Sequence, residues 1–258
     1  MAIAGLPLVL GMVWLGGWWL FGLIAVTAAL ALHEFFTVIR PLRPLTPAGY
    51  TGAVLALVAA ETGGPGWMLG GLLATLPIAL LLKGLGDTRA SATAAIGATT
   101  LGAIWIGCGL AHIILVREIP VHAQLAALTI LLAVFAGDTA AYFTGPLIGR
   151  HKLWPALSPG KTWEGFFAGS LATIAVTFFA LYQDREHFLC VWQIIVLGVV
   201  LALAAPAGDL FESAIKRDMQ VKDTGRILAG HGGVLDRIDA LLFAFAASYY
   251  LLRGFGAA

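Results

Sequence analysis

Charged residues are scarce in this sequence. Lys and Arg number 15 and Asp and Glu 14 among 258 residues, which is 11%, whereas soluble globular proteins carry about 25%. Hydrophobic residues make up 60% of the chain, and the mean hydropathy is +0.91. So few charges exclude a compact soluble protein of this size, and so much apolar character excludes intrinsic disorder. The composition therefore predicts an integral membrane protein.

Cysteine and net charge are also low. The two cysteines, Cys108 and Cys190, each lie alone in an apolar run, which excludes a disulfide framework. Neither has the neighbouring residues of an activated nucleophile, so catalysis through a thiol is not expected. The net charge of +1 excludes a protein that binds nucleic acid through bulk positive charge.

Long apolar stretches predict membrane-spanning helices, because about 20 apolar residues cross the hydrocarbon core. Continuous runs favour helices over a barrel, whose strands would alternate. The stretches lie near residues 3–39, 47–62, 65–82, 92–116, 122–146, 164–182, 188–208 and 237–252. The first is too long for one helix, and Gly16-Gly17 is a plausible break within it. We therefore expect an all-α polytopic membrane protein with about nine transmembrane helices, eight being the alternative.

Internal repeats and low-complexity linkers are absent from the sequence, so residues 1–258 are interpreted as a single membrane domain. We expect residues 1–120 to form N-terminal helices that are structural or dimer-forming. Residues 121–258 are expected to carry the catalytic helices and polar loops.

Positive charge is distributed unevenly between the alternate loops. One set of loops holds twelve Lys and Arg residues and the other set holds three, Arg117, Arg185 and Arg253. Because loops rich in Lys and Arg stay in the cytoplasm, the first set is predicted to be cytoplasmic. The expected location is the cell membrane, inner or plasma, with a polar cavity that faces the cytoplasm.

Most of the few charges gather in two segments of this cytoplasmic set. Eleven lie between residues 209 and 239 and five between 138 and 164, so 16 of 29 occupy 58 residues. The chemistry of the protein is therefore expected in the C-terminal half.

The segment 208–239 combines acids, bases and glycines. If the preceding helix continues past Pro206, then Asp209, Glu212, Ser213 and Lys216 share one face, because they are spaced i, i+3, i+4 and i+7. Carboxylate, hydroxyl and ammonium groups together can hold a hydrated cation and a phosphate. The alternative to such a binding site is a solvated loop with ordinary helix-capping acids.

Three further polar residues follow in the same segment. His231 precedes Gly232-Gly233, whose backbone a phosphate could approach closely. Asp236 and Asp239 occupy the first turn of the last helix. Asp236 is expected to face back toward Asp209.

The second segment contains an acid within an apolar helix and a polar helix start. Asp138 is a candidate functional residue, because a carboxylate within a membrane span is costly, and the alternative is a structural acid bonded to a neighbouring helix. Ser158, Lys161 and Thr162, followed by Glu164, open the next helix and suit a phosphate at a helix N-terminus. The string Pro-Gly-Lys-Thr here lacks the upstream glycine and strand of a P-loop.

Other polar residues in the spans give weaker signals. His33, Glu34, Glu61 and His112 lie in or near helices without the zinc-binding pattern H-E-x-x-H. They are interpreted as interfacial or packing groups.

The polar segments resemble a known family. Residues 213–239 follow the pattern S-x-I-K-R-x₄-K-D-x-G-x₂-L-x₂-H-G-G-V-x-D-R-I-D, which is similar to the signature of phosphatidate cytidylyltransferases. The strings D-x-x-A-Y-x-x-G and S-P-x-K-T-x-E-G within 138–165 resemble a second block of this family. Together they cover about a quarter of the chain. The sequence departs from the family at Ala229, usually Pro or Gly, and at Gly160, often Lys or Asn.

This resemblance implies the reaction of CTP with phosphatidic acid, which gives CDP-diacylglycerol and pyrophosphate by direct attack of the lipid phosphate on the α-phosphorus. It implies Mg²⁺ held by Asp209 and Asp236, allows a monovalent cation such as K⁺ beside it, and suggests a homodimer. Both substrates are anionic, so metal and Lys or Arg must neutralise them. Nucleic acid is not expected as a partner.

The resemblance also assigns roles to the other polar residues. The catalytic residues are expected to be Asp209, Lys216, Asp236 and Arg237. The residues expected to bind phosphates are Lys216, Arg217, Lys222 and Arg237. The groups expected to position substrate are Ser158, Lys161, Thr162, Glu164 and Ser213. Those expected to orient this shell are Asp223, His231 and Asp239, and Asp138 is a supporting or metal-facing acid.

Two other functions stay open from the sequence. One is a CTP-dependent enzyme acting on another lipid, such as a polyprenol kinase or an ether-lipid cytidylyltransferase, which product analysis would distinguish. The other is a transporter, which buried acids and nine helices would also suit. A transporter is expected to show an inverted repeat with paired broken helices, which this sequence lacks.

Overall fold

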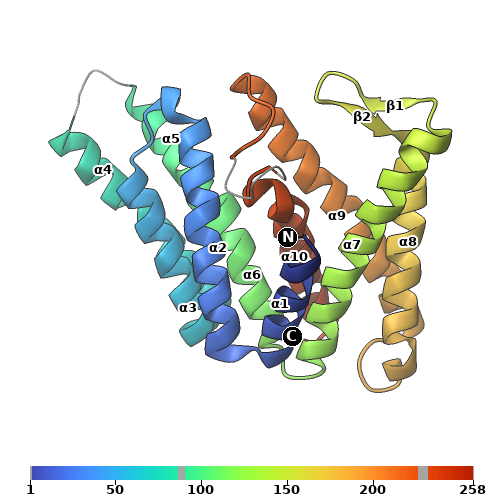
Figure 1. Ribbon diagram of the computed structural model, residues 1–258. Helices are drawn as coiled ribbons and strands as arrows, with labels where there is room; N and C mark the ends of the chain where they lie inside the picture. Colours follow the sequence, from blue (N-terminus) through green and yellow to red (C-terminus); the bar gives the residue numbers. More distant parts are fainter. Residues whose placement is uncertain (1, 87–90, 226–231, 258) are drawn as a thin grey trace. The chain divides into compact units, whose positions relative to one another are not determined.

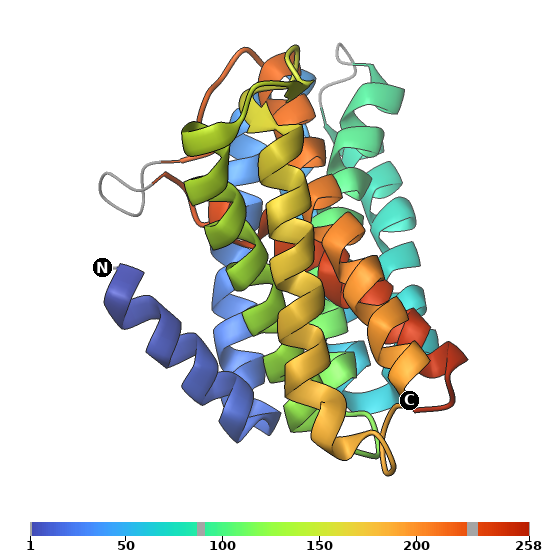
Figure 2. The ribbon, with the colours of Figure 1, turned by 90° about the vertical axis from the view of Figure 1, so that its right-hand side faces the viewer.

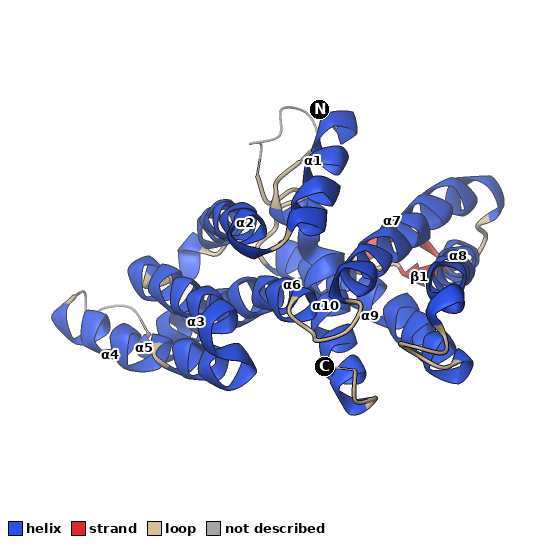
Figure 3. Ribbon diagram, turned by 90° about the horizontal axis from the view of Figure 1, so that it is seen from below, coloured by secondary structure: helices blue, strands red, loops and turns tan. Residues whose placement is uncertain are grey.

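The protein is described by a computed structural model that covers residues 2–86, 91–225 and 232–257 (Figure 1). Helices dominate it, and one short strand pair is the only sheet in these ranges (Figure 3). The chain forms two compact units, Met1–Leu115 with Asp218–Ile238, and Val116–Arg217 with Asp239–Ala258. The described residues of segment 218–238 thus cluster with the N-terminal helices. Each unit is described by itself below.

The first unit begins with two helices that separate at a glycine. α1 (Ala2–Leu15) and α2 (Gly17–Val38) flank Gly16, whose φ of 68° and ψ of −161° belong to a region open almost only to glycine. Figure 2 shows the two helices leaving this point in different directions. The break predicted at Gly16-Gly17 is therefore confirmed.

The remaining helices of the first unit follow the predicted apolar stretches only in part. α3 (Thr46–Leu73) is kinked at Gly64 (φ 72°), and α4 (Thr75–Leu85) continues after it. α5 (Ala92–Gly102), a π-helical segment (Ala103–Cys108) and α6 (Gly109–Arg117) form the next stretch. The stretch from α5 to α6 matches the predicted run 92–116. The predicted runs 47–62 and 65–82 are not separate helices, because α3 passes through the gap between them with a kink and ends at Leu73.

Small residues let the helices of this unit approach closely. A Cβ on Gly107 would lie 2.7 Å from the Ala53 side chain, and the Phe35 and Trp105 rings pack at 5.6 Å between centroids. Close contact through small residues is the usual basis of helix association in lipid, where apolar burial alone gives no net drive.

The second unit is built on a tightly packed helix pair joined by a hairpin. α7 (Ala123–Ile148) and α8 (Trp163–Leu181) lie side by side in both views (Figures 1 and 2). A Cβ on Gly169 would lie 2.8 Å from the Gly137 carbonyl oxygen, and Thr173 Oγ1 donates to the Ala133 carbonyl across the pair at 3.2 Å. Between them, β1 (Lys152–Trp154) and β2 (Ser158–Thr162) pair antiparallel.

Two further helices complete the second unit. α9 (Val191–Asp218) continues through Pro206 for three more turns, so the condition set by the sequence is met. Helices that cross membranes tolerate such a proline. α10 (Leu235–Gly254) contributes its residues from Asp239 onward to this unit.

Six helical stretches in the described ranges are long and apolar enough to cross a membrane. They are Gly17–Val38, Thr46–Leu85, Ala92–Arg117, Ala123–Ile148, Trp163–Asp184 and Val191–Asp218. Together with the near absence of sheet, they confirm the predicted all-α polytopic membrane architecture. The total of nine transmembrane helices stays a prediction.

Candidate active site

The polar residues of α9 form one face of a continuous helix. Because α9 extends to Asp218, Asp209, Glu212, Ser213 and Lys216 keep the helical spacing that the sequence predicted. Glu212 and Ser213 are buried, with 1% and 8% of their surface exposed. This face therefore carries carboxylate, hydroxyl and ammonium groups at the end of a membrane helix.

Asp209 connects this face to the hairpin. Its Oδ2 forms an ion pair with Lys161 Nζ on β2 at 2.6 Å, and Ser213 Oγ donates to its Oδ1 at 3.4 Å. Both charged side chains are partly open, Lys161 at 25% and Asp209 at 39% exposure. The structure thus brings together three predicted site residues from β2 and α9.

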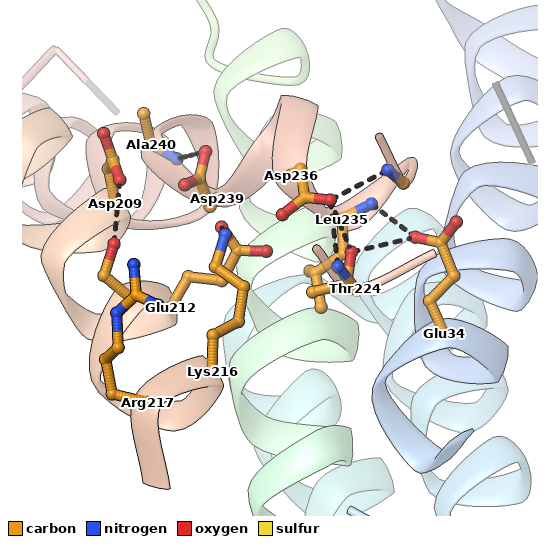
Figure 4. A network of polar contacts seen from close by, with 12 residues as sticks. Glu34, Asp209, Glu212, Lys216, Arg217, Thr224, Leu235, Asp236, Asp239 and Ala240 are labelled. Carbon is orange, nitrogen blue, oxygen red and sulfur yellow. Dashed lines mark hydrogen bonds and ion pairs between the residues drawn. The ribbon is translucent and has the colours of Figure 1, made fainter. Parts of the chain in front are cut away.

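A second pair of acids joins Glu212 on this face to Asp239 on α10. Lys216 Nζ is 3.0 Å from Glu212 Oε2, and the carboxyl groups of Glu212 and Asp239 are within hydrogen-bonding reach of each other. Asp239 is 7% exposed, and its Oδ1 accepts the backbone N–H of Ala240 at 2.7 Å (Figure 4). Gly208 lets α9 approach the backbone of Asp239 closely, because any side chain at position 208 would collide with that backbone.

Asp138 extends the acidic group toward α7. This exposed residue is close enough for its carboxyl to interact electrostatically with Asp209 and Lys161. Four carboxyl groups of the second unit thus lie near the ammonium groups of Lys161 and Lys216. They belong to Asp138, Asp209, Glu212 and Asp239. Such an excess of negative charge at a partly buried site calls for a proton or a cation.

Other predicted residues lie on the hairpin or next to it, and three of them make contacts there. Arg217 Nε donates to the Leu157 carbonyl at 3.1 Å. Thr162 caps α8 by accepting the Gly165 N–H at 3.1 Å. Glu164 Oε1 is 2.7 Å from His151 Nδ1, on the segment that enters the hairpin. Ser158 lies half-buried on β2.

Asp236 is the centre of a separate network in the first unit. Its Oδ2 accepts the N–H groups of Thr224 and Gly233 at 3.1 and 2.8 Å, and lies 2.9 Å from Thr224 Oγ1. Gly232 has a φ of 81°, a left-handed conformation that favours glycine. The turn before α10 is therefore shaped around this carboxylate.

The remaining predicted residues lie near this turn in the sequence. Lys222, Asp223 and Arg237 are exposed. His231 lies outside the described residues. Asp209 belongs to the second unit and Asp236 to the first, so their joint role in metal binding stays a prediction.

The structure adds one residue that sequence reasoning missed. Glu34 on α2 accepts the N–H groups of Val234 and Leu235 at 3.0 and 2.8 Å, and Thr224 Oγ1 lies 3.5 Å from its Oε2 (Figure 4). It is 2% exposed. The interpretation of Glu34 as an interfacial or packing group was therefore incomplete. Its signal in the sequence was a carboxylate within an otherwise apolar span.

Metal-binding chemistry is only partly assembled in the described ranges. Among residues 2–86, 91–225 and 232–257, His, Cys, Asp and Glu form no group of three or more arranged to hold a metal ion. Mg²⁺ in phosphoryl-transfer sites usually takes one or two carboxylates and completes its shell with water and substrate phosphates.

The fold and these clusters define a class: a helical membrane protein whose acids and bases gather at helix ends, suited to anionic substrates. Comparison with known proteins gives the family. The sequence matches the model of the Cytidylyltransferase family over residues 1–255. The chain therefore belongs to the Cytidylyltransferase family.

Curated relatives carry a more specific name, phosphatidate cytidylyltransferase. A Staphylococcus epidermidis protein is 45% identical over 121 residues, 47% of this chain and 46% of its own length. One from Staphylococcus haemolyticus is 39% identical over 148 residues, 57% and 55% of the two chains. One from Bacillus subtilis is 37% identical over 161 residues, 62% and 59% of the two chains. The chain thus spans about half the length of the curated relatives it matches.

Proposed function

We propose that the protein transfers the cytidylyl group of CTP to phosphatidic acid, giving CDP-diacylglycerol and pyrophosphate. The observation that carries the proposal is the cluster of the second unit, where Lys161 and Lys216 pair with Asp209 and Glu212. Bases suited to phosphates lie there beside acids suited to a cation. Membership of the Cytidylyltransferase family and the names of the curated relatives support the same reaction.

The reaction requires no protein nucleophile. An oxygen of the lipid phosphate bonds to the α-phosphorus of CTP, and the bond from that phosphorus to the oxygen bridging to the β-phosphate breaks. Pyrophosphate leaves with the bonding electrons. The task of the protein is therefore to position two anions and to neutralise the charge that develops.

Lys161 is the group we assign first to a substrate phosphate. Its side chain is 25% exposed, its ammonium nitrogen is buried, and this nitrogen pairs with Asp209 Oδ2. A phosphate oxygen can replace this carboxylate as the partner of Lys161 Nζ. In the same proposal, the other phosphate oxygens are bound by Ser213, Lys216, Arg217, Lys222 and Arg237.

The residues present suit a divalent cation. Asp209 and Asp236 supply the hard oxygen atoms that Mg²⁺ prefers, and we propose that they hold it. When bound, the ion would neutralise charge on the phosphates and orient them. The four carboxyl groups around Lys161 and Lys216 leave an excess of negative charge that a cation would offset. A monovalent cation such as K⁺ beside it belongs to the same proposal.

Location and assembly complete the proposal. The uneven distribution of Lys and Arg favours a cell membrane location with the polar segments facing the cytoplasm. The acyl chains of the lipid would then stay in the bilayer while its phosphate reaches the bases. The family resemblance favours a homodimer.

The test is CDP-lipid formation by purified protein with CTP, phosphatidic acid and Mg²⁺. Asp209→Asn and Asp236→Asn are each expected to abolish product while the protein still folds. Lys152→Met is a matched control, because this exposed lysine lies on the neighbouring strand β1 and outside the proposed set. Near-normal turnover in either Asn variant would refute the assignment.

A further inference from the structure

Glu34 is buried among backbone donors from a segment some 200 positions later in the chain. Its two oxygens accept the N–H groups of Val234, which directly precedes α10, and of Leu235, its first residue. The first N–H groups of a helix have no partner within the helix, and they carry its positive end. A carboxylate is the group that satisfies both needs, so Glu34 fixes the start of α10 to α2.

The same carboxylate is coupled to Asp236 through one hydroxyl. Thr224 Oγ1 lies 2.9 Å from Asp236 Oδ2 and 3.5 Å from Glu34 Oε2. Thr224 is 7% exposed, so water does not compete freely for its single proton. Displacement of Glu34 would therefore remove the acceptor of the Val234 and Leu235 N–H groups and loosen the turn on which Asp236 is held.

Two glycines allow this arrangement. A Cβ on Gly225 or on Gly233 would collide with the carboxylate of Glu34. Backbone at positions 225 and 233 thus closes around one side chain. Such enclosure by donors is more than packing requires, because an apolar residue would leave the N–H groups of Val234 and Leu235 buried without acceptors.

We propose that Glu34 is a positioning residue for Asp236: it holds residues 224–225 and 233–236 so that the Asp236 carboxylate is preset for the cation that serves CTP. This inference rests on the proposed function. Glu34 contacts backbone and Thr224 and acts through them. Partners that orient a ligating carboxylate typically change metal affinity by about 10- to 100-fold when they are lost.

The decisive variant is Glu34→Gln, which keeps the shape of the side chain but replaces one accepting oxygen with an amide donor. The Mg²⁺ concentration for half-maximal CDP-lipid formation is expected to rise by about tenfold or more. KM for phosphatidic acid is expected to change little. Glu61→Gln is the matched control, since Glu61 is a second carboxylate within a span of the same unit.

A readout independent of turnover accompanies the kinetics. Hydrogen exchange at the backbone amides of Val234 and Leu235 is expected to accelerate in Glu34→Gln and not in Glu61→Gln. The thermal stabilisation produced by Mg²⁺ with CTP is expected to shrink in Glu34→Gln alone. If Glu34→Gln fails to fold, Thr224→Val tests the same coupling, with a smaller rise in the Mg²⁺ requirement expected.

The outcomes separate this inference from the proposed function. Wild-type protein that makes no CDP-lipid would refute the proposed function, whatever the exchange data show. Active wild type with an unchanged Mg²⁺ requirement in Glu34→Gln and in Thr224→Val would overturn the positioning role. A loss of stability in Glu34→Gln with unchanged Mg²⁺ dependence would reduce Glu34 to a structural residue and would also overturn it.

Discussion

Replacement of Lys161 by methionine is expected to damage activity far more than stability. The Lys161–Asp209 pair is short, at 2.6 Å, yet its side chains are 25% and 39% exposed. Pairs open to water contribute only about 0.2–1 kcal/mol. The free energy of unfolding should therefore fall by no more than about 1 kcal/mol. Loss of one preorganised charge stabiliser at a reacting centre, in contrast, costs about 2.7–4 kcal/mol in the transition state, or about 100- to 1,000-fold in kcat.

The assay compares initial rates of CDP-lipid formation with thermal unfolding in the same detergent. Lys161→Arg is expected to recover part of the rate because it restores the charge. Lys152→Met, on the other strand of the hairpin, should behave as wild type. A near-normal rate in Lys161→Met would refute the reasoning, as would a loss of rate fully matched by a loss of stability.

Two further predictions concern stability. Lys216→Met removes the ammonium group that lies 3.0 Å from the carboxylate of Glu212, which is 1% exposed. Loss of one partner of a buried pair should lower the free energy of unfolding by about 3–5 kcal/mol. Adding Glu212→Gln should recover much of this loss. An uncharged double variant no more stable than Lys216→Met would contradict this. Gly169→Val should separate α7 from α8 and cost about 1–3 kcal/mol through overpacking, whereas Gly70→Ala, where a Cβ meets nothing within 4 Å, should not destabilise. Equal stability of the two variants would show that the helix contact is not close.

Periodicity and composition predicted the elements of this fold well. The break at Gly16 was predictable because one apolar run was too long for a single span, and only glycine readily adopts the conformation found there. The polar face of α9 was predictable because helical spacing alone brings Asp209 and Lys216 together. These features depend on local sequence, which is why the sequence suffices for them.

Contacts between distant segments were not predictable in the same way. The hairpin that carries Lys161 has short strands without alternation of apolar and polar residues, so the sequence pattern did not predict these strands. The hydrogen bonds from Val234 and Leu235 to Glu34 join residues 200 and 201 positions apart. Periodicity places a residue on a face of its own helix, but it does not identify the backbone that will meet that face.

The most direct test of the proposed reaction follows the two ends of the CTP triphosphate separately. Purified protein is incubated with phosphatidic acid and Mg²⁺, once with CTP labelled at the α-phosphorus and once with CTP labelled at the γ-phosphorus. Cytidylyl transfer predicts that only the α-label enters the lipid fraction, with the γ-label released as pyrophosphate. Transfer of the γ-label to lipid would indicate a kinase and would contradict the account.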